Sequence, residues 1–135
     1  MIHLTRKTEF SASHVCRIAG LSDEENFRLF GKSSYPNGHG HNYVLEVTVK
    51  GEPDPKTGMV INLTDLDVII KKNAADILDH RFLNIDIPHF KEIIPTTENI
   101  SLFIWDSIKG SLKGCALHMV RLYETPELYV EYYGE

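Results

Sequence analysis

The stretch Pro36-Asn37-Gly38-His39-Gly40-His41-Asn42-Tyr43 leads directly into a strand-like run, Val44-Leu45-Glu46-Val47-Thr48-Val49. Residues two apart in an extended strand project from the same face, so His39 and His41 share a face with Tyr43 and the apolar residues beyond it. The glycines on either side of His39 let another segment or a ligand approach the backbone closely. Two imidazoles at the mouth of a buried face can bind one metal ion. A catalytic metal usually has a third protein ligand and an open position, and the rest of the chain should supply both.

The composition restricts the kinds of protein that this chain can be. Its 135 residues suit one domain, and we expect residues 1–135 to form a single domain. With 42% hydrophobic and 24% charged residues it has the composition of a soluble globular protein. A net charge of −5 without a Lys or Arg cluster speaks against nucleic acid and anionic membranes as partners. We find no signal peptide and no long apolar span, and two cysteines are too few for a disulfide scaffold, so the expected location is the reducing cytoplasm.

The expected elements follow one another in the order β, β, α, α, β, β, with one short helix inserted between the first two strands. The expected strands are Ile2–His14, His39–Lys50, Leu117–Glu124 and Leu128–Tyr133, and the expected helices are Ser22–Phe30, Asn62–Leu78 and Thr96–Gly110. The segment from Phe82 to Pro95 has no strong period and is expected to be a connection. This order predicts an α+β fold, in which a four-stranded antiparallel sheet carries two helices on one face.

His14 is the best candidate for a third metal ligand. It ends the first expected strand, so pairing of the first two strands would place it beside His39 and His41. Three imidazoles without a set of thiolates fit a catalytic zinc better than a structural one, since structural zinc sites favour cysteine. A lone histidine is more often a surface or core residue, but the neighbouring His-Gly-His favours the ligand interpretation.

Asp79 and His80 follow directly after an expected helix. An aspartate beside a histidine can fix the tautomer of the imidazole and raise its basicity. The alternative is a capping aspartate next to a solvated histidine, and the sequence leaves both interpretations open.

Glu124 ends an otherwise apolar face of an expected strand. A buried carboxylate there could accept two N–H bonds from a guanidine-like edge of a ligand, although the strand pattern alone favours an exposed charge. Thr96, Thr97 and Glu98 form the cap and first turn of the following helix. Cys16 is expected on the same face as His14, where a free cysteine most often serves as a small buried hydrophobe.

Several motifs occur in a fixed order along nearly the whole chain. They include Phe10-Ser11-Ala12-Ser13-His14, Leu21-Ser22-Asp23-Glu24-Glu25-Asn26, Pro36-Asn37-Gly38-His39-Gly40-His41-Asn42-Tyr43, Leu78-Asp79-His80, Thr96-Thr97-Glu98-Asn99, Tyr123-Glu124-Thr125 and Tyr133-Gly134-Glu135. In these motifs the chain resembles the 6-pyruvoyl-tetrahydropterin synthase family. The resemblance implies a tunnelling fold, in which subunits pool four-stranded sheets into a barrel and two trimers stack as a homohexamer with active sites between subunits.

The resemblance also implies the chemistry and the residues that perform it. It implies a lyase that converts 7,8-dihydroneopterin triphosphate to 6-pyruvoyl-tetrahydropterin, with Zn²⁺ as the only cofactor because the redox change is internal. It implies that zinc is bound by His14, His39 and His41, that the pterin ring is anchored by Glu124 in a pocket shaped by Thr97 and Glu98, and that protons are transferred by Asp79 and His80 together with a cysteine.

Ser33 stands where the resemblance implies the cysteine. A serine hydroxyl is much harder to ionise than a thiol near neutral pH, so it cannot simply take over the role of a base. Three hypotheses follow. His80, oriented by Asp79, acts as the base while Ser33 positions the substrate; or Cys16 supplies a thiolate; or the protein binds zinc and pterin but performs slower or different chemistry.

Different chemistry would mean formation of a hydroxymethyl-dihydropterin or a 6-carboxy-tetrahydropterin, or binding with little turnover. The triphosphate of the substrate needs cations, and the candidates near the site are Lys32 and Arg17.

Overall fold

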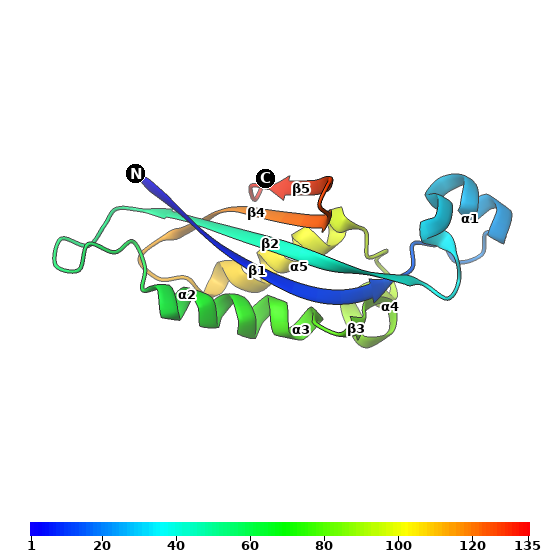
Figure 1. The fold of residues 1–135 in the computed structure, drawn as a ribbon, viewed down its shortest axis with the longest axis horizontal. Helices are drawn as coiled ribbons and strands as arrows, with labels where there is room; N and C mark the ends of the chain where they lie inside the picture. Colours follow the sequence, from blue (N-terminus) through cyan, green and yellow to red (C-terminus); the bar gives the residue numbers. More distant parts are fainter.

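The computed structural model describes all 135 residues as an α+β fold with a five-stranded sheet in the order β3-β1-β2-β4-β5 (Figure 1). The strands are β1 (Ile2–His14), β2 (His39–Gly51), β3 (Arg81–Phe82), β4 (Ala116–Thr125) and β5 (Leu128–Tyr132). The α-helices are α1 (Asp23–Phe30), α2 (Leu63–Ile70), α3 (Asp76–Leu78), α4 (Leu83–Asp86) and α5 (Thr97–Ile108). A π-helical segment, η2 (Lys71–Ala75), joins α2 to α3, and 3₁₀ turns form η1 (Gly31–Ser34), η3 (Pro88–Lys91) and η4 (Lys109–Ser111).

The four expected strands form, and β1–β2, β2–β4 and β4–β5 all pair antiparallel. The predicted count of four strands was wrong, because β3 adds a fifth strand parallel to β1 at Ala12 and Ser13. Side chains rather than a hydrophobic pattern hold this short strand. Phe82 N–H donates to Asp86 Oδ2, and Asn84 bonds the backbone of Val15 in both directions.

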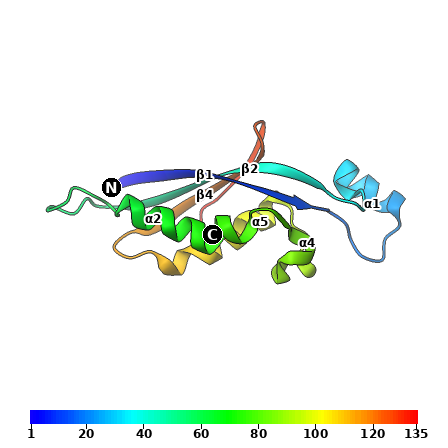
Figure 2. The same ribbon diagram turned by 60° about the horizontal axis from the view of Figure 1, so that its bottom comes forward.

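The two long helical segments cover one face of the sheet, as expected (Figure 2). The core between the layers is built from Phe10, Tyr43, Leu45, Val47, Val49, Val120 and Leu122 of the sheet and Leu66, Ile70, Ile100, Ile104 and Ile108 of the helices. The alternation of buried and exposed residues along β2 therefore has the period expected for a strand with one buried face. None of the helices combines the length and apolar character needed to cross a membrane.

The helix boundaries agree with the capping residues. Asn62 caps α2 by accepting from the N–H groups of Thr64 and Asp65, and Thr96 caps α5 by accepting from Asn99 N–H. The expected helix from Asn62 to Leu78 is one run that widens to π geometry over η2. The expected connection after Phe82 contains α4 and η3, which a pattern with a period of 3.6 residues could not reveal in such short pieces.

The insertion that carries α1 lies beyond the end of the sheet (Figures 1 and 2). Ser22 and Glu25 form the predicted capping box, and Gly31 ends the helix with a positive φ. Asn26 is fully buried and accepts from Ile18 N–H, while its amide N–H group donates to several backbone carbonyls before and at the start of the helix. One side chain thus pairs with four backbone groups of the turn that precedes α1.

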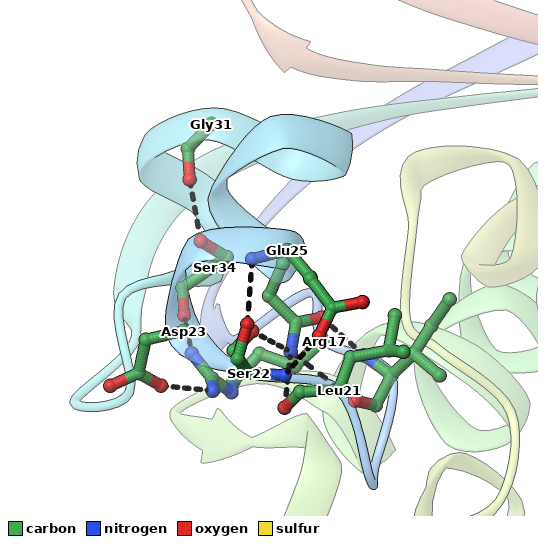
Figure 3. Close-up of polar contacts among 9 residues, drawn as sticks. Arg17, Leu21, Ser22, Asp23, Glu25, Gly31 and Ser34 are labelled. Carbon is green, nitrogen blue, oxygen red and sulfur yellow. Dashed lines mark hydrogen bonds and ion pairs between the residues drawn. The ribbon is translucent and has the colours of Figure 1, made fainter.

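A second polar network fixes η1 against the end of β1. The guanidinium of Arg17 donates to Ser34 O and to Asp23, and Ser34 Oγ donates to Gly31 O (Figure 3). Cys16 N–H donates to Ser33 O at 2.8 Å. The turn that carries Ser33 is therefore tied to the strand that carries His14.

Candidate metal and substrate site

Strand pairing brings His14, His39 and His41 together. In the β1–β2 register His14 is opposite His39 and Ala12 is opposite His41, so the three imidazoles lie on the helix-covered face at the end of the sheet. Their candidate ligand atoms lie within 4.8 Å of one another, and the two Nε2 atoms of His14 and His39 are 3.1 Å apart. A Cβ at Gly38 would meet His14 O at 3.0 Å, and its φ of +74° also favours glycine.

The surroundings of the cluster keep the imidazoles in the form that binds a metal. His14 Nδ1 is 2.6 Å from Pro95 O, and because a carbonyl only accepts, Nδ1 carries the proton and Nε2 is left with its lone pair. Burial lowers the pKa of both His14 and His41, which favours neutral rings. His41 Nε2 is buried without a hydrogen-bond partner. Three imidazole nitrogens, one of them buried without a partner, fit a zinc ion.

Glu124 lies beside this cluster. Its Oε1 is 3.6 Å from His41 Nε2, and Thr97 Oγ1 donates to its Oε2. The side chain is 18% exposed, so it is not the exposed strand-end charge that the strand pattern alone favoured. The start of α5 therefore covers the carboxylate, with Thr97 buried and Glu98 exposed.

Asp79 and His80 lie at the outer edge of β1. Asp79 Oδ1 accepts from Ser11 N–H at 2.9 Å, and its Oδ2 is 2.9 Å from His80 Nδ1. These bonds lower the pKa of Asp79. His80 is the one non-glycine residue with a positive φ, and its ring is 83% exposed. The aspartate thus orients the imidazole and leaves its Nε2 free to face solvent or another molecule.

His80 also lines a hollow of about 560 Å³ beside the strands that carry the imidazole cluster. His41, Asn42 and Arg81 are among the other residues that line it. Of the three candidate metal ligands, His41 alone lines this hollow.

Ser33 and Cys16 lie at the same end of β1 as His14, where Cys16 N–H donates to Ser33 O at 2.8 Å. The hydroxyl of Ser33 takes part in no hydrogen bond within the chain, and no hydrogen bond joins Ser33 to His80 or to the three imidazoles. Cys16 is buried, and burial together with the charges of Glu124 and Glu98 raises its pKa to about 11. Its thiol therefore stays protonated near neutral pH, which weighs against the hypothesis of a Cys16 thiolate.

The two candidate cations for the triphosphate differ in their surroundings. Arg17 is committed to Asp23 and to Ser34 O, so its charge already serves the fold of the insertion. Lys32 is exposed and forms no ion pair.

Tyr43 has a polar role that the sequence did not reveal. The strand pattern placed it on the apolar face, and its ring is indeed fully buried and stacked on Phe10. Its hydroxyl, however, is buried without a hydrogen-bond partner. Burial and the charge of Glu124 raise the pKa of Tyr43, so the phenol keeps its proton. Its position two residues after His41 was the one available signal.

Comparisons with known proteins show which sequences and folds this chain is similar to. Residues 3–135 match the family model described as 6-pyruvoyl tetrahydropterin synthase. The chain is 49% identical over 132 residues to 6-pyruvoyl tetrahydrobiopterin synthase of Pongo abelii, covering 98% of this chain and 91% of that protein. It is 30% identical over 149 residues to 6-carboxy-5,6,7,8-tetrahydropterin synthase of Rickettsia felis, covering 97% and 99%. The solved structure of Caenorhabditis elegans 6-pyruvoyl tetrahydropterin synthase superposes with a TM-score of 0.93 at 37% identity, covering 99% of this chain and 96% of that one.

Proposed function

Because this chain belongs to the 6-pyruvoyl tetrahydropterin synthase family, we propose that it is a zinc-dependent lyase acting on 7,8-dihydroneopterin triphosphate. The product would be 6-pyruvoyl-tetrahydropterin, formed with loss of triphosphate. The observation that carries the proposal is the set of three imidazole nitrogens within 4.8 Å that lies next to the paired Glu124 and Thr97. A metal site beside a partly buried carboxylate suits a substrate with hydroxyl groups at one end and a row of N–H groups at the other.

His14, His39 and His41 would hold the zinc ion, which as a Lewis acid would polarise the side-chain hydroxyl oxygens and make the neighbouring C–H bonds more acidic. The proton on His14 Nδ1 is fixed by Pro95 O, so this ligand needs no rearrangement to present Nε2.

Glu124 would anchor the pterin ring. An ionised carboxylate accepts two parallel N–H bonds from the amino-pyrimidine edge of a pterin, in the same way as it accepts from a guanidinium. Thr97 would hold the carboxylate in place through its hydrogen bond to Oε2, and Glu98, exposed on the next residue of α5, would line the pocket.

His80 is the group best suited to move protons along the substrate side chain. Asp79 binds its Nδ1, so Nε2 is the basic atom, and it is exposed. In the proposed reaction a proton leaves the first side-chain carbon and one is added to the ring carbon that bears the side chain, so the ring C=N bond is reduced as the first hydroxyl carbon becomes a ketone. A proton then leaves the second side-chain carbon as the C–O bond to the triphosphate breaks, and the resulting enol takes up a proton at the terminal carbon to give the second ketone. Electrons move only within the substrate, so the balance closes without a further oxidant or reductant.

The exposed position of His80 has a structural explanation in subunit assembly. Ser11 N–H and C=O both point to the outer edge of β1, where they bind Asp79 and His80. Beyond this point β1 has no outer strand partner from Ile2 to Phe10, and β5 forms the opposite free edge of the sheet. Two free edges allow identical sheets to join side by side into a closed ring. We therefore propose a homohexamer of two stacked trimers, in which His80 meets the metal site of a neighbouring subunit while Ser33 stays beside the metal site of its own subunit.

The test is product analysis after incubation of zinc-loaded protein with 7,8-dihydroneopterin triphosphate under anaerobic, reducing conditions. The proposal expects release of triphosphate and a dicarbonyl pterin.

Glu124→Gln should raise KM for the triphosphate substrate, because a neutral amide cannot accept both N–H bonds. In the product analysis, a pterin product with a shortened side chain would assign the related lyase reaction that forms a carboxy- or hydroxymethyl-pterin. Bound zinc without any product would assign a zinc- and pterin-binding protein. This is the second candidate function, and the serine at position 33 is the observation that supports it.

A further inference from the structure

We infer that the hydroxyl of Tyr43 is a further substrate-binding group, which makes a hydrogen bond to the pterin ring at the floor of the site. The inference rests on the proposed function and adds one residue to the site. The substrate would then contact Tyr43 between its contact with Glu124 and its contact with the metal.

Tyr43 lies between the two ends of the site. On β2 it follows His41 by two residues, so both side chains project from the helix-covered face. Across the sheet Val44 is opposite Tyr123, which brings Glu124 to the position next to Tyr43. The ring centroids of His14 and His41 lie 6.2 and 5.5 Å from that of Tyr43, with the rings edge to face. The ring of Tyr43 therefore lies between the candidate metal ligands on one side and the candidate pterin anchor Glu124 on the other.

The packing of the ring does not require a hydroxyl. Tyr43 is 0% exposed and stacks on Phe10 with centroids 5.1 Å apart and an interplanar angle of 12°. A phenylalanine would make the same stack. The hydroxyl is buried with no partner in the chain, and a buried polar group without a partner destabilises the fold.

The two orphaned side-chain atoms of this chain belong to the same site. They are His41 Nε2 and Tyr43 Oη, and every other buried side-chain nitrogen or oxygen has a partner. Glu124 approaches the first at 3.6 Å, which is beyond hydrogen-bond distance. In the proposed site the zinc ion would take up His41 Nε2, so the hydroxyl of Tyr43 is the one group of the two that is left for the substrate. A phenol can donate one hydrogen bond and accept others, so it can bind a ring nitrogen or a ring carbonyl of a pterin.

The experiment compares Tyr43→Phe with wild-type protein in binding of neopterin, a fluorescent pterin that lacks the triphosphate leaving group and is not consumed. Fluorescence titrations give Kd for zinc-loaded protein and for protein stripped of metal with a chelator. Thermal unfolding without ligand reports stability. Tyr129→Phe, which removes an exposed hydroxyl from β5, is the matched control, and Glu124→Gln reports whether neopterin occupies the proposed site.

We expect Tyr43→Phe to weaken neopterin binding about five- to tenfold, with and without zinc, while Tyr129→Phe leaves Kd unchanged. The unliganded Tyr43→Phe protein should unfold at the same temperature as wild type or slightly higher, because the hydroxyl has no partner to lose. Unchanged affinity in Tyr43→Phe, together with weakened binding in Glu124→Gln, would overturn this inference and leave the proposed function intact. A loss of affinity that appears only with zinc bound would also overturn it, since the contact would then not be to the ring. Absence of neopterin binding by wild-type protein would overturn the proposed function, and the inference with it.

Discussion

The imidazole of His14 shows how a single residue can be prepared for metal binding before any metal arrives. Its ring is 1% exposed, Pro95 O fixes the proton on Nδ1, and Nε2 faces His39. Burial makes a charged ring unfavourable, so the pKa of His14 is lowered. Protons therefore compete less with a metal at this site than they would at an exposed histidine.

The lowered pKa values of His14 and His41 predict how the stability of the metal-free protein depends on pH. In the unfolded chain both imidazoles take up protons near pH 6.5, whereas in the folded chain they do so only at lower pH. The unfolded state then binds more protons, so the free energy of unfolding falls as pH drops from 7.5 to 5.5. Urea denaturation in the presence of a chelator measures this dependence. The free energy of unfolding should change less with pH in His14→Gln than in the wild-type protein. An equal change in the two proteins would show that His14 does not cause the pH dependence.

Substitutions at Ser33 and Cys16 test at which of these two positions a thiol contributes to turnover. Ser33→Cys restores a group that ionises far more readily than a hydroxyl, and we expect kcat for the triphosphate substrate to rise at least about tenfold. Cys16→Ala should leave kcat within about twofold, because a thiol with a pKa of about 11 supplies little thiolate. Steady-state kinetics at pH 7 to 8 decides both. A large loss in Cys16→Ala would show that the buried thiol takes part after all.

At the scale of elements, the α1 insertion depends on one buried amide. In the turn from Ile18 to Ser22, the side chain of Asn26 pairs with backbone groups of Ile18, Leu21 and Ser22. Arg17 then connects this turn to η1, so the position of Ser33 depends on the same network. An element held by polar contacts can open locally while the sheet stays folded.

Asn26→Ala should therefore destabilise α1 and η1 by roughly 2 to 4 kcal/mol, the cost of leaving several buried backbone groups unpaired. Hydrogen exchange measured by mass spectrometry should show faster exchange in residues 16–34 and unchanged exchange in β2 and β4. Glu24→Ala, an exposed change on the same helix, is the control. If exchange rises equally in the sheet, the insertion is not an independent unit.

The sequence predicted the elements that have either a period or a cap, and it missed the others. The capping residues Ser22 and Thr96 placed two helix starts correctly. β3 has two residues and α4 has four, so neither is long enough to show a period. What holds them is the pairing of Asn84 and Asp86 with distant or local backbone groups, which follows only from the tertiary structure.

The candidate site was predictable to a similar degree. His39 and His41 follow from a local pattern, and His14 follows from pairing of two strands with strong periods. The burial of Glu124 depends on how the start of α5 docks onto β4, which no single segment encodes. Tyr43 was placed correctly on the buried face, but whether a buried hydroxyl has a partner is a property of the assembled site.

At the scale of the whole molecule, the strongest remaining feature is the long free edge of β1. Ser11 directs its N–H and C=O outward to Asp79 and His80, and backbone direction alternates along a strand, so the other odd-numbered residues of β1 also point outward. The even-numbered residues point to β2 instead. A sheet edge of this length is normally covered, and a neighbouring copy of the same sheet would cover it.

This alternation predicts that proline substitutions at two adjacent positions have different effects, one on assembly and the other on folding. Lys7→Pro removes an outward N–H, so the subunit should fold but assemble into species smaller than a hexamer. Thr8→Pro removes an N–H that faces β2, so it should unfold the subunit itself. Light scattering gives the oligomer mass and circular dichroism the folded fraction. Because His80 reaches a metal site only across the subunit boundary in our proposal, folded Lys7→Pro protein should keep zinc yet lose turnover. A folded Lys7→Pro protein that stays hexameric would show that β1 does not form the subunit contact.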